Sequence, residues 1–190
     1  MFAAAVIGQD AKPEIKISQV DVRIDQQFTP QIQATNVVDK RWKPKQWLEI
    51  QVDLKAAIAR SLGGREGTYP AIEVKYYLAL AGVKTKDNKQ VVMTGTISYK
   101  DVANGENHTL GFITPATMKR LLQKETGGKG DISVFGVEIT AGGDVVGGKS
   151  STGSKFWEAA DKISFEDAVI SKEKTPFAPF WGDFDLAASK

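Results

Sequence analysis

The chain has 190 residues, of which 42% are hydrophobic and 25% charged, so it can bury the core of one ordinary domain. Its 25 Lys and Arg residues against 23 Asp and Glu leave a net charge of +2, which disfavours nucleic-acid binding as a class. The lack of Cys excludes disulfides, thiolate metal sites and cysteine nucleophiles, and the single histidine, His108, excludes every site that needs two.

The first eleven residues differ in character from the rest. Residues 2–7 are apolar, but this run is far shorter than the ~20 apolar residues of a membrane-spanning helix, and no basic segment precedes it as in an intact signal peptide. Residues 1–11 are therefore either the remnant of an export signal or a disordered tail. No other apolar run approaches spanning length, so we expect residues 12–186 to form a single domain without a membrane span.

Alternation of apolar and polar residues with a period of two dominates the sequence and predicts β-strands. Residues 15–24 follow this pattern with a change of phase at Ser18 and Gln19, which predicts a β-bulge. Residues 48–54 form the clearest half-buried strand, because their apolar side chains alternate with acidic and amide side chains.

Two further strands flank a predicted hairpin loop. Residues 72–80 and 91–99 alternate in the same way, and the polar stretch 84–89 between them predicts the loop. Gly95 lies inside the second of these strands, where a glycine indicates a bulge or the close approach of another backbone.

The second half of the chain has fewer strand signals. The polar stretch 104–109 is predicted to be a loop. Residues 132–140 predict a strand, residues 141–144 a turn, and Val145 the beginning of the return.

Helical signals are few. Thr114 and Pro115 place a capping hydroxyl before a proline at the first helical position, and apolar residues at helical spacing follow, so a short helix is predicted here. Residues 56–62 fit either a second short helix or an irregular strand end, and residues 157–160 could form one further helical turn. Together these elements predict an all-β, mainly antiparallel sandwich of about seven to nine strands, rather than alternating βαβ units.

One stretch matches a catalytic motif. Residues 143–150 fit the phosphate-binding pattern G-x-x-x-x-G-K-[ST], in which glycine amides hold phosphates and the lysine, here Lys149, neutralises their charge. That loop must open a long helix, yet the following residues carry no helical stripe, and no apolar run ending in an aspartate follows to bind the metal. The context argues against a nucleotide site, and we predict no enzyme activity and no cofactor or metal.

Other polar residues offer no more specific chemistry. His108 is predicted to be a solvated loop histidine, because the sequence indicates no nucleophile or orienting carboxylate for it. Asn107 begins an N-glycosylation pattern, which matters only in a host that uses it. Asp183 and Asp185 could point to one face of a strand and bind a cation, but solvation at the surface is the favoured interpretation.

The aromatic residues carry more information. Trp42 and Trp47 flank a short basic stretch, and Phe177, Phe180 and Trp181 crowd the C-terminal segment. Aromatic faces stack on sugars and anchor protein interfaces, so these five are the candidate interaction residues. The favoured interpretation, however, is that they cap the ends of the sandwich core. A segment this aromatic is expected to dock on its own domain or on a neighbouring subunit.

The C-terminal segment also carries a family resemblance. Residues 171–184 read SKEKTPFAPFWGDF, and together with the strand at 47–54 they resemble a family of verrucomicrobial, Akkermansia-type pilus-like proteins from a type IV pilus-associated locus. The resemblance covers residues 12–186, including the aromatic segment 175–186. It implies an immunoglobulin-like fold, an extracytoplasmic location and a role in pilus formation or adhesion. Type IV pilins carry a long apolar N-terminal helix, whereas here only residues 2–7 are apolar.

From these observations we predict an extracytoplasmic structural or adhesive module of a pilus-like or surface assembly. Protein partners in that assembly, including further copies of the chain, are expected, and a host surface or glycan is a further candidate. The alternative function is a carbohydrate-binding module that uses the exposed aromatic residues. No nucleic-acid partner is expected.

Overall fold

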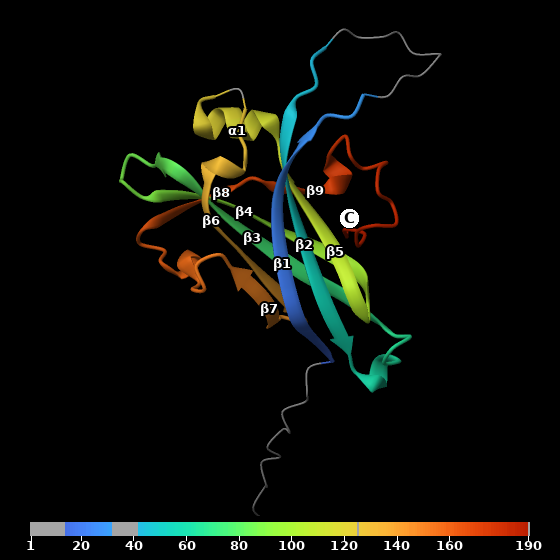
Figure 1. Cartoon of the computed structure of the whole chain (residues 1–190). Coiled ribbons are helices and arrows are strands. Elements are labelled where there is room, and N and C mark those ends of the chain that lie inside the picture. The colour runs from blue at the N-terminus through green and yellow to red at the C-terminus, as the bar shows by residue number, and fades with distance from the viewer. Residues whose placement is uncertain (1–13, 32–41, 125, 190) are drawn as a thin grey trace, which may run out of the picture.

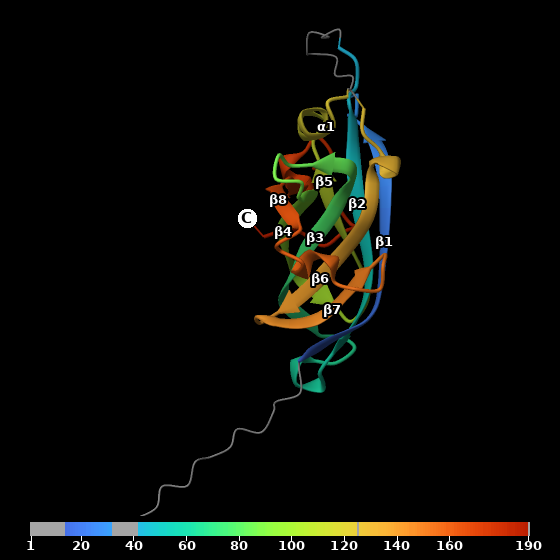
Figure 2. The same cartoon turned by 90° about the vertical axis from the view of Figure 1, so that its left-hand side faces the viewer.

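The computed structural model describes residues 14–31, 42–124 and 126–189. The segment 1–11, predicted as a tail or an export-signal remnant, lies outside the described residues. Within the described ranges, nine strands form two sheets that lie against each other as two layers (Figure 1, Figure 2). The predicted all-β sandwich with a short helix is confirmed.

Sheet A has the strand order β1-β2-β5-β9, and every neighbouring pair in it is antiparallel. Its core-facing residues are apolar on every second position of β2, as the alternation predicts. The strands are β1 (Ile15–Phe28), β2 (Gln46–Ile58), β5 (Gly105–Ile113) and β9 (Val169–Ser171).

Sheet B has the order β7-β6-β3-β4-β8. Its pairs are antiparallel except for β4 and β8, which run parallel. The segment between β7 and β8 passes over the outer face of this sheet, where Trp157 stacks on Tyr77. The strands are β3 (Thr68–Lys84), β4 (Gln90–Ala103), β6 (Ile132–Ala141), β7 (Asp144–Ser150) and β8 (Ile163–Asp167).

Two local predictions about these strands are confirmed. The register of β1 against β2 shifts between Ile17 and Gln19, so the change of phase in the sequence does mark a bulge. Gly95 of β4 marks a close approach, because a Cβ atom there would lie 2.3 Å from the carbonyl oxygen of Val169 in β9. The predicted hairpin loop at 84–89 connects β3 to β4.

The prediction of a loop at 104–109 is wrong, since residues 105–109 belong to β5, an interior strand of sheet A. The alternation is concealed because two polar residues face inward. The Asn107 amide bonds to the backbone N–H and C=O of Ala103, at 3.0 and 2.8 Å. The Thr109 hydroxyl lies 3.2 Å from the hydroxyl of Tyr76. Local partners replace water for both side chains, so a strand forms where polarity suggested a loop.

Helix α1 (Pro115–Leu122) lies at one end of the sandwich (Figure 1). The Thr114 hydroxyl accepts a hydrogen bond of 3.0 Å from the backbone N–H of Thr117, which confirms the predicted cap. At residues 56–62, β2 continues to Ile58 and a single 3-10 turn follows, η1 (Arg60–Leu62). The other 3-10 turns are η2 (Lys129–Asp131), η3 (Phe156–Glu158), which corresponds to the predicted turn near 157–160, and η4 (Lys172–Lys174).

A buried polar chain links the two sheets inside the apolar core. Tyr76 of β3 and Tyr99 of β4 are fully buried, and their hydroxyl oxygens are 2.8 Å apart. The Tyr99 hydroxyl donates to the carbonyl oxygen of Leu110 in β5 at 2.9 Å. Burial raises the pKa of Tyr76 to about 12, so this side chain is neutral at physiological pH. These bonds fix the position of β5 against sheet B.

Both lateral edges of the sandwich are closed. On one side β1 packs against β7 so closely that a Cβ atom on Gly147 would lie 2.7 Å from the Cβ of Ile17. On the other side, residues 186–189 cross from sheet A to sheet B. The Leu186 N–H donates to the carbonyl oxygen of His108, and the Ser189 N–H donates to that of Ser98.

Candidate functional site

The C-terminal segment, residues 172–186, lies against the outer face of sheet A beside β5 (Figure 1). Phe177 anchors it: only 2% exposed, its ring stacks on Phe112 with centroids 5.0 Å apart and meets Trp47 edge-on at 5.8 Å. Leu110 completes this small buried cluster. The aromatic segment therefore docks on its own chain, one of the two alternatives expected from the sequence.

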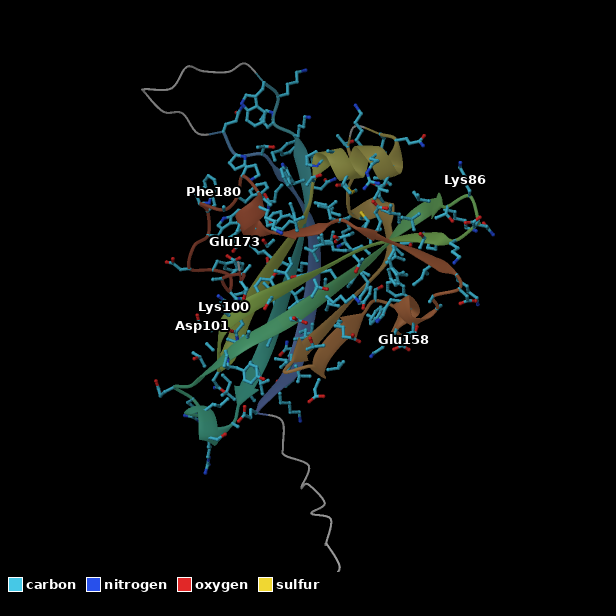
Figure 3. The ribbon with its side chains drawn as sticks, turned by 180° about the vertical axis from the view of Figure 1, so that it is seen from behind. Lys86, Lys100, Asp101, Glu158, Glu173 and Phe180 are labelled. Carbon is cyan, nitrogen blue, oxygen red and sulfur yellow. The ribbon has the colours of Figure 1, made fainter. Side chains whose placement is uncertain are left out.

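A buried ion pair fixes the rest of this segment. The side chains of Lys172 and Asp185 are 7% and 2% exposed, and their charged groups are in direct contact. Lys172 also donates to the carbonyl oxygens of Phe180 and Trp181, at 3.3 and 3.4 Å. Burial raises the pKa of Asp185, although the hydrogen bond from Lys172 acts to lower it. Lys172 thus holds the loop around Phe180, which Figure 3 labels near Glu173.

A pocket of about 280 Å³ lies between this loop and sheet A. Side chains from the outer face of β1, β2 and β5 form its floor, and two aromatic side chains of the loop form its walls. The floor residues are Gln27, Glu49, Gln51 and Leu110, and the wall residues are Trp181 and Phe184.

Glu49 is the unusual residue of the floor. It is 7% exposed, yet its carboxylate oxygen Oε2 has no hydrogen-bond partner among the described residues. Burial raises the pKa of Glu49, a hydrogen bond from Gln27 lowers it, and the nearby Asp25 raises it again. Asp25 is its direct cross-strand neighbour on β1, so two carboxylates face each other across the strand pair. A buried acceptor without a partner is uncommon in folded proteins, so Oε2 is a candidate to accept a hydrogen bond from a bound ligand.

The two walls are held by stacking. Trp181 stacks on Phe177 with centroids 5.8 Å apart, and Phe184 stacks on His108 at 4.5 Å. Even so, Trp181 remains 42% exposed and Phe184 44% exposed. Trp181 has a φ of 57°, in the left-handed region that bulky side chains rarely adopt. One face of each ring is thus supported by protein while part of each ring stays open to solvent.

The His108 ring that supports Phe184 is itself oriented by a carboxylate. Its Nδ1 lies 2.6 Å from Asp53 of β2, and the same carboxylate accepts hydrogen bonds from Arg23 and Gln51, also at 2.6 Å. Burial acts to raise the pKa of Asp53, but these three hydrogen bonds lower it overall. His108 is therefore a half-buried strand residue with a carboxylate partner, and the prediction of a solvated loop histidine is wrong.

The five aromatic residues predicted to interact lie in different environments. Trp42 is 47% exposed, and Trp47 is half-buried and donates its indole N–H to the Thr29 hydroxyl at 3.0 Å. Phe177 is buried and Phe180 half-buried, so they hold the segment in place. Of the five, only Trp181 lines the pocket.

The remaining candidate motifs are not assembled into sites. Residues 143–150 form a turn and the edge strand β7, and Lys149 pairs with Asp21 at 2.5 Å, so no phosphate-binding loop is formed. The expectation that Asp185 is solvated at the surface is wrong, because it is buried against Lys172. Asn107 is 5% exposed. Within the described ranges, no group of three His, Asp or Glu side chains could hold a metal ion.

Sequence reasoning missed most of the pocket. Glu49 and Gln51 appear in the sequence as the polar side of a half-buried strand, which normally faces water. Phe184 follows the aromatic run but carries no signal of its own. The C-terminal aromatic segment was the only signal in the sequence that could have indicated the pocket. If this segment packs on the polar face of a strand, it must also bury some of the acidic side chains on that face.

A protein-family model matches residues 8–190, almost the whole chain. The chain belongs to this family. A crystal structure of a protein from Akkermansia muciniphila has a similar fold, with a TM-score of 0.75 and 20% sequence identity, covering 97% of this chain and 99% of that chain. At this identity the structural match shows the fold alone. No curated protein sequence matches the chain.

Within the described residues of this chain, no helix has the length and apolar character needed to cross a membrane. The immunoglobulin-like classification and the link to a pilus locus stay predictions.

Proposed function

We propose that this chain is an extracytoplasmic structural or adhesive module that functions by binding within a pilus-like or surface assembly. The observation that carries the proposal is the docked C-terminal segment, which builds a pocket with two partly open aromatic walls on the outer face of sheet A. Rigid, supported aromatic rings around a small pocket are typical of binding surfaces. The family resemblance of this same segment supports the pilus context.

A second candidate function, carbohydrate binding, is favoured by one specific feature. Trp181 and Phe184 stand beside the side-chain amides of Gln27 and Gln51 in the pocket. Aromatic faces that stack on sugar rings and amides that bond to hydroxyls form a common arrangement for such ligands.

The main proposal is tested in a bacterium that carries this gene. Antibodies against the chain should label surface filaments, and sheared filament fractions should contain the chain. Recovery of the chain only in the cytoplasmic fraction would contradict the proposal.

A pair of variants connects that test to the pocket. Trp181→Ala removes one open wall and should release the chain from the filament fraction. Val145→Ala serves as the control, because Val145 is a 56% exposed apolar residue on β7 in sheet B. If both variants stay in the filament fraction, the pocket plays no part in assembly.

A further inference from the structure

The carboxylate oxygen Oε2 of Glu49, which lacks a hydrogen-bond partner among the described residues, is the most specific feature of the pocket. We propose that this pocket binds a single organic cation, the ammonium or guanidinium group of a Lys or Arg side chain presented by a protein partner. The inference rests on the proposed binding function and names the chemistry of the partner at that site.

The size and walls of the pocket fit such a group. A volume of about 280 Å³ accommodates one long side chain. Trp181 and Phe184, both partly exposed, line the same pocket as Glu49. A cation beside aromatic faces is attracted by their quadrupoles, most strongly where water is excluded.

The charges around the pocket favour a cation over a neutral ligand. No lysine or arginine is among the lining residues, and Asp25 faces Glu49 across the strands. Asp53 is on the same face of β2, but its carboxylate already has Arg23 as a partner. A sugar hydroxyl could donate to Glu49 but would leave its charge uncompensated in a desolvated position, whereas an ammonium or guanidinium group supplies both the donor and the charge.

A metal ion fits the pocket less well. Oxygen-binding cations take six or more ligands, and the described residues bring no cluster of three acidic or histidine side chains together. The apolar walls also suit an organic cation better than a hydrated ion.

The test is an NMR titration of the full-length chain with Nα-acetyl-lysine-N-methylamide and its arginine counterpart. The neutral norleucine analogue has the same backbone without the charge, and methyl glucoside represents a sugar. We expect saturable shifts of the Trp181 indole N–H with the two cations and none with the neutral probes. Glu49→Gln should weaken cation binding by about tenfold or more.

Glu138→Gln is the matched control. Glu138 is a carboxylate near a buried tryptophan on sheet B, but it is already paired with Lys155 at 2.9 Å. This variant should bind the cations like the parent chain. The free energy of unfolding of each variant shows whether a loss of binding is only a loss of folding.

Several results would overturn the proposal: equal shifts with norleucine, binding of methyl glucoside instead of the cations, no saturable shift with any probe, or unchanged cation affinity in Glu49→Gln. None of these would contradict the assembly role, because filament fractionation tests that role separately. Light scattering over a range of concentrations distinguishes the sources of the cation. Self-association lost in Glu49→Gln identifies a second copy of this chain, and a monomer that still binds the cations identifies a different protein.

Discussion

The two outer faces of the sandwich are covered in similar ways but with different polar chemistry. On sheet B, Trp157 from the segment before β8 stacks on Tyr77 with ring centroids 4.5 Å apart. On sheet A, Phe177 stacks on Phe112 at 5.0 Å. We call the segment between β7 and β8 the cover of sheet B, and the C-terminal segment, residues 172–186, the cover of sheet A. Figure 3 shows them on opposite sides of the molecule, with Glu158 in the first and Phe180 in the second. Each sheet thus places a small aromatic cluster outside the main core.

The covers differ in what they do with charge. The cover of sheet B has an ion pair at the surface, between Lys155 and Glu138. The cover of sheet A buries the ion pair of Lys172 and Asp185 and also buries Glu49 without a full set of partners. Buried charge adds little to stability relative to apolar packing, so its presence on one cover only indicates a function beyond covering the sheet.

The largest expected effect comes from breaking the buried ion pair. Lys172→Met leaves the Asp185 carboxylate buried without its partner and should lower the free energy of unfolding by about 3–5 kcal/mol. Lys155→Met breaks the exposed pair on the other cover and should cost less than about 1 kcal/mol. Urea denaturation of both variants measures the difference. Equal losses in the free energy of unfolding would mean that the buried and the exposed ion pair contribute equally to stability.

The aromatic anchors should be nearly equivalent in packing. Phe177→Ala and Trp157→Ala each remove a buried ring and should each lower the free energy of unfolding by about 3 kcal/mol. They should differ in binding, because only Phe177 supports the pocket wall Trp181. Thermal unfolding and the cation titration together test this, and a Trp157→Ala variant that loses cation binding while still folded would refute it.

Glu49→Gln should stabilise the chain. Burial raises the pKa of Glu49 above its ordinary 4.5, so the folded state favours the protonated carboxyl. The parent chain is therefore relatively most stable below pH 4.5 and loses stability as the pH rises through the folded-state pKa. At pH 7 we expect a gain of about 1 kcal/mol in Glu49→Gln that disappears in acid. A variant less stable than the parent at pH 7 would show that the carboxylate is satisfied.

The smallest effect is expected at Asp53, on the same face of β2 as Glu49. Its hydrogen bonds lower its pKa below the ordinary 3.8, so its contribution is present above that pH and is lost as the pH falls through the folded-state pKa. Asp53→Asn should cost about 0.5–1 kcal/mol at pH 7 and nothing in strong acid. Unfolding curves at both pH values check the sign, which should be opposite to that of Glu49→Gln.

The sequence predicted the parts of the fold that depend on local patterns. The bulge after Ile17, the cap at Thr114 and the close approach at Gly95 each follow from one or two residues and their neighbours. Strand β5 was missed because Asn107 and Thr109 find polar partners within the fold, and those partners cannot be seen in a one-dimensional pattern.

The candidate site was predictable only in part. Trp181 was identified because it lies in a segment rich in aromatic residues, and such a segment needs a surface to pack on. Glu49 could not be found, because its role depends on the C-terminal segment lying over the polar face of a strand more than a hundred residues earlier. Long-range coverage of this kind converts an ordinary surface carboxylate into a buried one.

The position of the pocket walls in the chain sets the order in which the site can form. Trp181 and Phe184 follow all nine strands of the described residues, and the crossing of residues 186–189 from His108 to Ser98 comes later still. During synthesis from the N-terminus, the sheets can associate before these residues emerge. Until then the face of sheet A that carries Glu49 stays hydrated, so the proposed binding site is complete only after Trp181 and Phe184 have been added.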